Sequence, residues 1–189
     1  MRIIGLAGTN GSGKDSLGQI LADGYGYMFV SVADFLRDEA KKRGLPIERE
    51  VLRTISAEWR REYGLGVLVD RAVELFQKSG KNYKGLAISP MRNGGEADRL
   101  KELGGRLVWI DADPKIRYGR ITNRARSTED KKTYEQFLAE EQAEMQPSGD
   151  EATLSLSDVK KRADIFIQND VESLEDFRQI IDQKLAQLL

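Results

Sequence analysis

A glycine-rich segment near the N-terminus has the residue types and the spacing needed to bind phosphate. Two glycines frame four residues and a lysine follows, in the order Gly8-Thr9-Asn10-Gly11-Ser12-Gly13-Lys14. Glycines let successive backbone N–H groups curl around phosphate oxygens, and the N-terminus of the following helix adds a favourable dipole. The lysine of such a loop reaches the β- and γ-phosphates. All seven residues are therefore predicted to bind ATP, with Lys14 also catalytic; an ordinary glycine-rich turn is the alternative.

The two residues after this lysine suggest a metal site. The usual pattern places Ser or Thr directly after the lysine, where its hydroxyl binds Mg²⁺. Here Asp15 takes that position and Ser16 comes next. Carboxylates are good Mg²⁺ ligands, so Asp15 and Ser16 are predicted to hold Mg²⁺ beside the nucleotide. The alternative for Asp15 is a partner of the helix dipole in the first turn.

Composition restricts the remaining chemistry. The 189 residues include no Cys and no His. Thiolate catalysis, disulfides, imidazole catalysis and His- or Cys-ligated metals are therefore excluded. Catalysis must use carboxylates, hydroxyls, Lys, Arg, backbone amides or a hard metal such as Mg²⁺.

Net charge and hydropathy indicate which partners and which cellular location to expect. Lys and Arg total 30 against 31 Asp and Glu, for a net charge of -1. This balance argues against stable nucleic-acid binding over the whole surface. No apolar run approaches the roughly 20 residues that span a bilayer, and the first run is too short for a signal peptide. A cytoplasmic protein without membrane partners, either a monomer or a homodimer, is expected.

Short apolar runs alternate with amphipathic stretches along the chain. The runs predict five strands, at residues 2–7, 28–32, 86–89, 107–110 and 165–167. Between them, helical spacing of apolar residues predicts helices such as 34–43 and 67–77, and a last helix capped by Ser173. This alternation predicts an α/β fold, a parallel sheet with helices on both faces. Residues 146–157, rich in Ser, Thr and Asp with a Pro and a Gly, are predicted to form a mobile loop.

Several motifs together resemble the P-loop nucleoside monophosphate kinases, most closely the dephospho-CoA kinase-like and deoxynucleotide monophosphate kinase-like branch. They are Gly13-Lys14-Asp15-Ser16, Asp34-Phe35-Leu36-Arg37, Ser89-Pro90-Met91-Arg92-Asn93, Asp111-Ala112-Asp113-Pro114 and Gln168-Asn169-Asp170. The resemblance implies one P-loop kinase domain over residues 1–189 with a five-stranded parallel sheet of order 2-3-1-4-5. It also implies an acceptor-binding helical region near 34–80 and a lid near 120–132.

The resemblance further assigns roles to arginines. Arg37 and Arg92 would hold the phosphate of the acceptor, and the lid residues Arg120, Arg124 and Arg126 would act catalytically on the transferring phosphoryl group. Clustered cations suit phosphoryl transfer because negative charge spreads over the oxygens in the transition state. A solvated helix face and an RNA-binding patch are the alternatives for the lid cluster. Beyond it, residues 133–159 contain acidic residues and no Lys or Arg; a solvated helix is predicted there, with pairing to the lid as the alternative.

Three residues keep more than one interpretation. Asn169 follows the last strand, where such kinases often bind the donor's purine, but a strand-ending turn is also compatible. Asp34 could act as a general base toward a hydroxyl acceptor, or it could anchor Arg37 or cap its helix. Ser89 stands where these kinases commonly carry an Asp that supports Mg²⁺, and Asp15, Asp34 and Asp111 are the candidates to replace it.

The leading hypothesis is an ATP- and Mg²⁺-dependent transferase that moves the γ-phosphoryl group to a small acceptor, a nucleoside or deoxynucleoside monophosphate. Transfer to a hydroxyl, as in a dephospho-CoA kinase, is the nearest alternative. An NTP-binding regulatory protein is an alternative of another class, and an RNA-binding module is disfavoured by the net charge. The motifs decide neither the acceptor's base and sugar nor ATP against GTP.

Overall fold

The chain folds around a five-stranded parallel sheet with strand order β2-β3-β1-β4-β5. A computed structural model describes residues 1–79, 82–124, 132–146 and 149–189. The strands are β1 (Arg2–Gly8), β2 (Tyr27–Ser31), β3 (Gly85–Ser89), β4 (Arg106–Asp111) and β5 (Ile165–Gln168). The predicted fold class, strand positions and strand order are therefore confirmed.

The central strand shows why the sheet must be covered on both sides. In β1, Ile3 and Ala7 belong to one apolar cluster, while Ile4 and Leu6 belong to the other. All four side chains are buried. Successive residues of a strand point to opposite faces, so a continuous apolar run needs helices on both.

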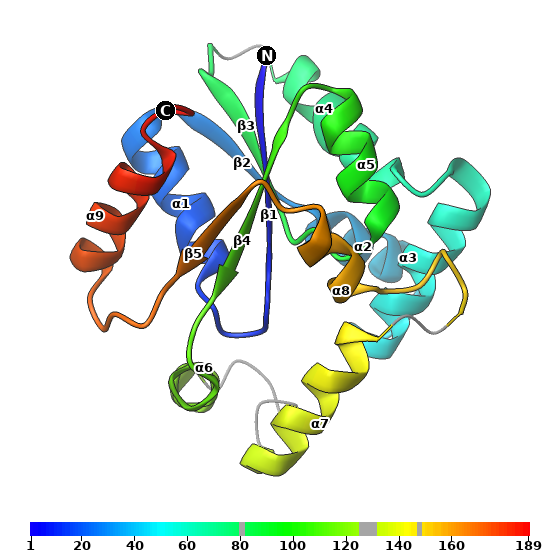
Figure 1. The fold of residues 1–189 in the computed structure, drawn as a ribbon. Coiled ribbons are helices and arrows are strands. Elements are labelled where there is room, and N and C mark those ends of the chain that lie inside the picture. The colour runs from blue at the N-terminus through cyan, green and yellow to red at the C-terminus, as the bar shows by residue number, and fades with distance from the viewer. Residues whose placement is uncertain (80–81, 125–131, 147–148) are drawn as a thin grey trace.

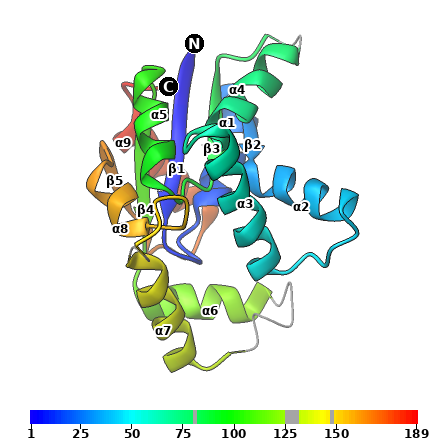
Figure 2. The same ribbon diagram turned by 90° about the vertical axis from the view of Figure 1, so that its right-hand side faces the viewer.

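Helices cover the two faces unequally. On one face lie α1 (Lys14–Tyr25) and α9 (Leu174–Leu185). The other face carries α2 (Val32–Lys42), α3 (Arg49–Tyr63), α4 (Val67–Lys78), α5 (Gly94–Glu102) and α8 (Leu156–Lys161). Two further helices, α6 (Pro114–Arg124) and α7 (Tyr134–Met145), lie beyond the carboxyl ends of the strands (Figures 1 and 2).

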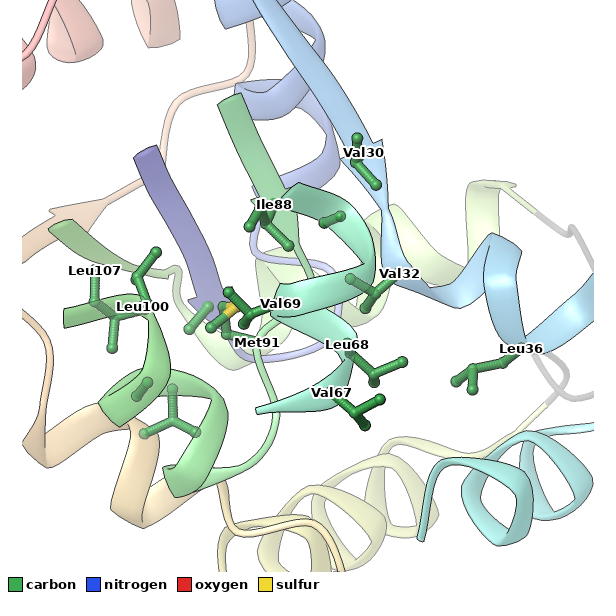
Figure 3. Close-up of a cluster of buried hydrophobic side chains, with 14 of the residues drawn as sticks. Val30, Val32, Leu36, Val67, Leu68, Val69, Ile88, Met91, Leu100 and Leu107 are labelled. Carbon is green, nitrogen blue, oxygen red and sulfur yellow. The ribbon is translucent and has the colours of Figure 1, made fainter. Parts of the chain in front are cut away.

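The larger apolar cluster fixes the helices that surround the carboxyl end of β3. Figure 3 shows Ile88 of β3 near Val69 of α4, and Val32 and Leu36 of α2 toward Leu68. Fully burying an aliphatic side chain of this size contributes about 1.5–3 kcal/mol. The cluster therefore gives α2, α3 and the turn after β3 a rigid base.

The predicted mobile loop at residues 146–157 is wrong for the residues of it that the structure describes. The side chain of Asn93 donates to the carbonyl oxygens of Glu151 and Thr153, each at 2.7 Å. Ala152 and Leu156 are buried, and Leu156 already begins α8. Backbone carbonyls that accept partly buried hydrogen bonds hold this polar segment in place, which composition alone does not reveal.

No helix in the described part of the chain combines the length and the apolar character that crossing a membrane requires.

Candidate functional site: a phosphate loop between two cavities

The glycine-rich loop joins β1 to α1, and its glycines are required by close packing. Gly11 and Gly13 have φ of 81° and 99°, a region that side chains other than glycine disfavour. A Cβ on Gly11 would lie 2.7 Å from the carbonyl oxygen of Arg117, and one on Gly13 would meet the side chain of Asn169. The loop therefore keeps its shape because α6 and the end of β5 press against it.

Side chains from the neighbouring strand ends brace the same loop. The Thr9 hydroxyl donates to Asp111 at 2.7 Å, and the Asn169 amide donates to the Ser12 carbonyl at 2.8 Å. Asn169 is buried, and its backbone N–H donates to the carbonyl of Asp111. Asn169 thus supports the loop directly, and its predicted contact with the donor's purine stays a prediction.

One cavity of about 640 Å³ opens on the loop side that faces α9. Its lining includes Asn10, Gly11, Gly13, Lys14, Asp15, Ser16, Arg120 and Asn169. Lys14 itself is 7% exposed, and its ammonium group donates to the Thr9 carbonyl at 3.1 Å. The structure therefore brings most of the loop residues, Arg120 and Asn169 to a single cavity, which we name the donor cavity. Gly8, Thr9 and Ser12 are not among the residues that line it.

The carboxylate after Lys14 meets the hydroxyl at the end of β3. The Ser89 hydroxyl donates to the Asp15 carboxylate at 3.1 Å, and Ser89 is fully buried while Asp15 is exposed. The usual arrangement has a hydroxyl after the lysine and a carboxylate at the strand end, so the two residue types are exchanged here. The pair still offers one carboxylate and one hydroxyl, which suits Mg²⁺ because most of its ligands are water and phosphate oxygens. Among the described residues, no cluster of three acidic side chains offers another site.

A second cavity, of about 200 Å³, lies between α2, α3 and the turn after β3. Arg37 and Arg92 both line it, as the resemblance implies for acceptor-binding residues. Arg49, Arg53 and Arg60 of α3 line it too. We name it the acceptor cavity, and the roles of its arginines remain predictions.

The α3 arginines were not singled out from the sequence, although a signal was present. Arg49, Arg53 and Arg60 are spaced by four and seven residues, so they lie along one side of a helix. The apolar positions Leu52, Ile55 and Trp59 identified the helix but drew attention only to its core-facing side. Arginines at helical spacing, next to the apolar positions that face the core, are the sequence signal that identifies them.

A buried ion pair sets the position of Arg92. The Arg60 guanidinium donates to Glu96 at 2.7 Å, with side-chain exposures of 2% and 1%. The other Glu96 oxygen accepts from the backbone N–H groups of Arg92 and Asn93, at 2.8 and 3.1 Å. A further Arg60 bond goes to the carbonyl of Ala152. The turn that carries Arg92 is therefore fixed by groups from α3 and α5.

Asp34 does not cap its helix, because α2 already begins at Val32 with Ser31 as the capping position. Its carboxylate pairs with Arg37 at 2.6 Å, and its side chain is 64% exposed. Asp34 is not among the residues that line the acceptor cavity. Of the alternatives open from the sequence, the structure shows the anchoring of Arg37.

The predicted lid arginines fall in different places. Arg120 in α6 donates to the carbonyl of Val171 at 2.6 Å, at the donor cavity. Arg124 is the last residue of α6. Arg126 lies outside the described residues, as does most of the predicted lid.

The predicted solvated helix is wrong at two acidic residues of α7, Glu141 and Glu144, whereas Glu135 and Glu140 are exposed as expected. Glu141 of α7 holds the buried Arg117 by two hydrogen bonds, one of 2.8 Å, and Glu144 pairs with Arg53 and Arg92. These acids are spaced by three residues on α7, which lies beside α6 (Figure 2). The pairing is with α3, α6 and the turn after β3. Glu140 also pairs with Lys132, the last residue of the predicted lid, so the alternative of pairing to the lid is confirmed at that residue.

Comparison with known proteins agrees with this architecture. Residues 4–146 match the family described as AAA domain, AAA_18. A UPF0200 protein of Pyrobaculum aerophilum is 31% identical over 190 residues, covering 100% of this chain and 99% of that protein. The chain belongs to the UPF0200 family and carries an AAA domain. A UPF0200 protein of Pyrococcus abyssi is 29% identical over 191 residues, covering 99% of the chain and 97% of the relative.

Solved structures extend the likeness of the UPF0200 chain at the level of fold. TT1252 from Thermus thermophilus matches with a TM-score of 0.57 at 22% identity, covering 99% of this chain and 97% of the other. The shikimate kinase of Bacteroides thetaiotaomicron has a TM-score of 0.57 at 14% identity, with 97% of each chain covered. The gluconokinase of Sinorhizobium meliloti reaches 0.53 at 18% identity, covering 99% and 92%. The fold is therefore that of P-loop kinases, and the nucleoside monophosphate kinase branch stays a prediction.

Proposed function

We propose that the UPF0200 chain is an ATP- and Mg²⁺-dependent phosphotransferase that moves the γ-phosphoryl group to a nucleoside or deoxynucleoside monophosphate. One observation carries the proposal. The carboxyl end of the sheet holds a phosphate loop with the donor cavity and, separately, an acceptor cavity lined by arginines. Open α/β sheets bind ligands at this end. Transfer of a phosphoryl group between two phosphate-bearing molecules requires two neighbouring anion-binding sites.

The residues would act by positioning and charge. Backbone amides of the loop and the Lys14 ammonium group hold the triphosphate, while Arg37 and Arg92 hold the phosphate of the acceptor. An acceptor phosphate oxygen is already ionised near neutral pH, so no general base is required. This agrees with Asp34, which pairs with Arg37 and does not line the acceptor cavity. Holding both reactants in line converts a bimolecular step into one within a complex.

Asp15 and Ser16, which both line the donor cavity, are the residues proposed to hold Mg²⁺, and the Ser89 hydroxyl supports Asp15 by a hydrogen bond. When bound, the ion would neutralise charge on the β- and γ-phosphate oxygens. Arg120, Arg124 and Arg126 are proposed to add positive charge around the transferring group. The Arg120 guanidinium is held at the donor cavity by the Val171 carbonyl.

Steady-state assays with a panel of nucleoside and deoxynucleoside monophosphates, and with dephospho-CoA, test this function. Lys14→Ala is expected to lower kcat/KM at least 100-fold, because a preorganised donor to transition-state charge contributes about 10²–10³. Lys115→Ala, an exposed lysine of α6, is the matched control and should leave the rate unchanged.

The other outcomes separate the alternatives. Turnover of dephospho-CoA alone would replace the proposed acceptor with a hydroxyl acceptor. Nucleotide-dependent capture of a protein partner, with no turnover of any acceptor, would favour a regulatory protein.

A further inference from the structure

A carboxylate of the chain occupies the space between two arginines of the acceptor cavity. One Glu144 oxygen accepts from Arg53, and the other accepts from Arg92 at 2.9 Å. Glu144 comes from α7, whereas Arg53 lies on α3 and Arg92 on the turn after β3. Its side chain is 12% exposed. Three separate elements thus converge on one carboxylate.

The electrostatics show that this contact is a charged one. Burial pushes the pKa of Glu144 up, but the Arg92, Arg53 and Arg49 guanidinium groups outweigh it, so the pKa lies below its ordinary value. Glu144 therefore carries its negative charge at neutral pH. Without it, Arg53 would keep its exposed partner Glu50 at 2.7 Å, but the described residues give the partly buried Arg92 no other carboxylate, which is unfavourable. This position consequently requires a negative oxygen ligand.

The bonding pattern resembles that of a phosphate group. Each oxygen of the carboxylate meets a different guanidinium group, as two oxygens of a phosphate monoester can. Both arginines line the acceptor cavity together with Arg37. A phosphate monoester at pH 7 carries about -1.5 to -2 charges and three acceptor oxygens, against one charge and two oxygens for a carboxylate.

Building on the proposed function, we propose that Arg53 joins Arg37 and Arg92 in binding the acceptor's phosphate, and that the Glu144 carboxylate occupies the subsite between Arg53 and Arg92 until a phosphate dianion displaces it. Because Glu144 is tethered, it competes at high effective concentration against any free anion. A free carboxylate carries the same single negative charge as Glu144, whereas a phosphate dianion carries more negative charge than Glu144. Glu144 is thus a specificity determinant that favours phosphate-bearing acceptors over carboxylate-bearing ones.

The displaced side chain has a place to go. A groove of about 980 Å³ between α3 and α7 is lined by Glu144, Arg53 and Arg49, and it also borders Gln146. Rotation of the Glu144 side chain into this groove would clear the space between Arg53 and Arg92. The exchange therefore needs no rearrangement of the sheet or of α3.

Side-chain NMR of the full chain tests the subsite without relying on turnover. The guanidinium N–H signals of Arg53 and Arg92, assigned with Arg53→Met and Arg92→Met, are followed during titration with inorganic phosphate and, separately, with acetate. If Glu144 fills the subsite about nine-tenths of the time, Glu144→Gln tightens phosphate binding about tenfold. The ratio of phosphate to acetate affinity should fall in the same variant. Glu135→Gln, an exposed residue of α7, is the charge-matched control and should change neither.

Three results would overturn the proposal. The first is a phosphate affinity at these two arginines that is unchanged or weaker in Glu144→Gln. The second is a tightening of phosphate binding by Glu144→Gln that persists in the double variant Glu144→Gln/Arg53→Met. The third is a phosphate affinity that is the same in Arg53→Met as in the wild type. This comparison does not involve Glu144→Gln, so it remains valid even if that variant folds poorly. Because these signals report the subsite alone, absence of phosphoryl transfer would count against the proposed function and not against the subsite.

Discussion

At the scale of single residues, the proposed metal-binding part of the site is an exchange of two side-chain types. Asp15 supplies a carboxylate where a hydroxyl is usual, and Ser89 supplies a hydroxyl where a carboxylate is usual, with a 3.1 Å hydrogen bond between them. Chemistry at a metal site depends on which oxygens reach the ion, not on which element delivers them. The exchange therefore preserves the ligand set that the proposed function needs.

This exchange predicts a specific rescue. Asp15→Ser is expected to raise the Mg²⁺ concentration needed for half-maximal ATP-analogue binding about tenfold, because the carboxylate is lost. Adding Ser89→Asp should recover most of this loss by returning a carboxylate to the same place. Calorimetric titration with and without Mg²⁺ measures it, and melting midpoints control for folding. An unaltered Mg²⁺ requirement in Asp15→Ser would remove Asp15 from the metal site.

At the scale of elements, a few buried polar contacts fix the turn after β3. Arg60 of α3 and Glu96 of α5 pair in the interior, and Glu96 also accepts from the backbone of Arg92. Apolar packing beneath them holds the helices, and this network, together with backbone bonds of Met91 to Leu6 and of Ser155 to Arg92, specifies the direction of the turn. The acceptor cavity thus depends on an ion pair that is itself almost fully buried.

Removing one partner of this pair should be costly. Glu96→Gln leaves the Arg60 charge buried without its partner, so the free energy of unfolding is expected to fall by about 3 kcal/mol. Urea denaturation measures the change, and the acceptor KM should rise more than kcat falls. Glu74→Gln breaks the exposed pair with Lys78 and should leave the free energy of unfolding within experimental error. A loss in Glu96→Gln no larger than in this control would contradict the role given to the pair.

Protonation of Glu144 at acid pH should weaken the contact of α7 with Arg53 and Arg92. Its pKa in the folded chain is lowered, on balance, by Arg92 and Arg53 despite the opposing effect of burial. A group with a depressed folded pKa contributes stability above its unfolded pKa, about 4.3 for Glu, and loses it as pH falls through the folded value. Wild-type stability should therefore fall more steeply below about pH 4.3 than that of Glu144→Gln. Urea denaturation at a series of pH values checks this, and parallel curves would rule it out.

At the scale of the whole molecule, the phosphate loop joins distant parts of the chain. Asn169 follows the last strand, yet its side chain donates to Ser12 in the N-terminal loop, and Gly13 packs against it. The order of the strands makes this contact possible, since β4 lies between β1 and β5. The loop is therefore held by the completed sheet and not by its own sequence alone.

Asn169→Ala tests that dependence. It removes the donor to a buried carbonyl, so the free energy of unfolding is expected to fall by about 2 kcal/mol. The affinity for an ATP analogue should fall with it, because the loop loses support on the side of the donor cavity. Gln168→Ala, an exposed neighbour, serves as the control. Denaturation and calorimetry together check both effects, and a fully retained affinity would show that the loop holds its shape unaided.

Local patterns in the sequence were sufficient to predict the architecture and the phosphate loop on the donor side of the site. Two-sided apolar runs predict buried parallel strands, and the spacing of glycines around Lys14 predicts the phosphate loop, because both depend on residues close together in the chain. The contacts that complete the site join residues far apart. Asp15 meets Ser89 across 74 positions, Arg92 meets Glu144 across 52, and Arg53 meets Glu144 across 91. Such pairs form only where packed helices and strand ends converge, so the tertiary structure alone decided which charges face each other.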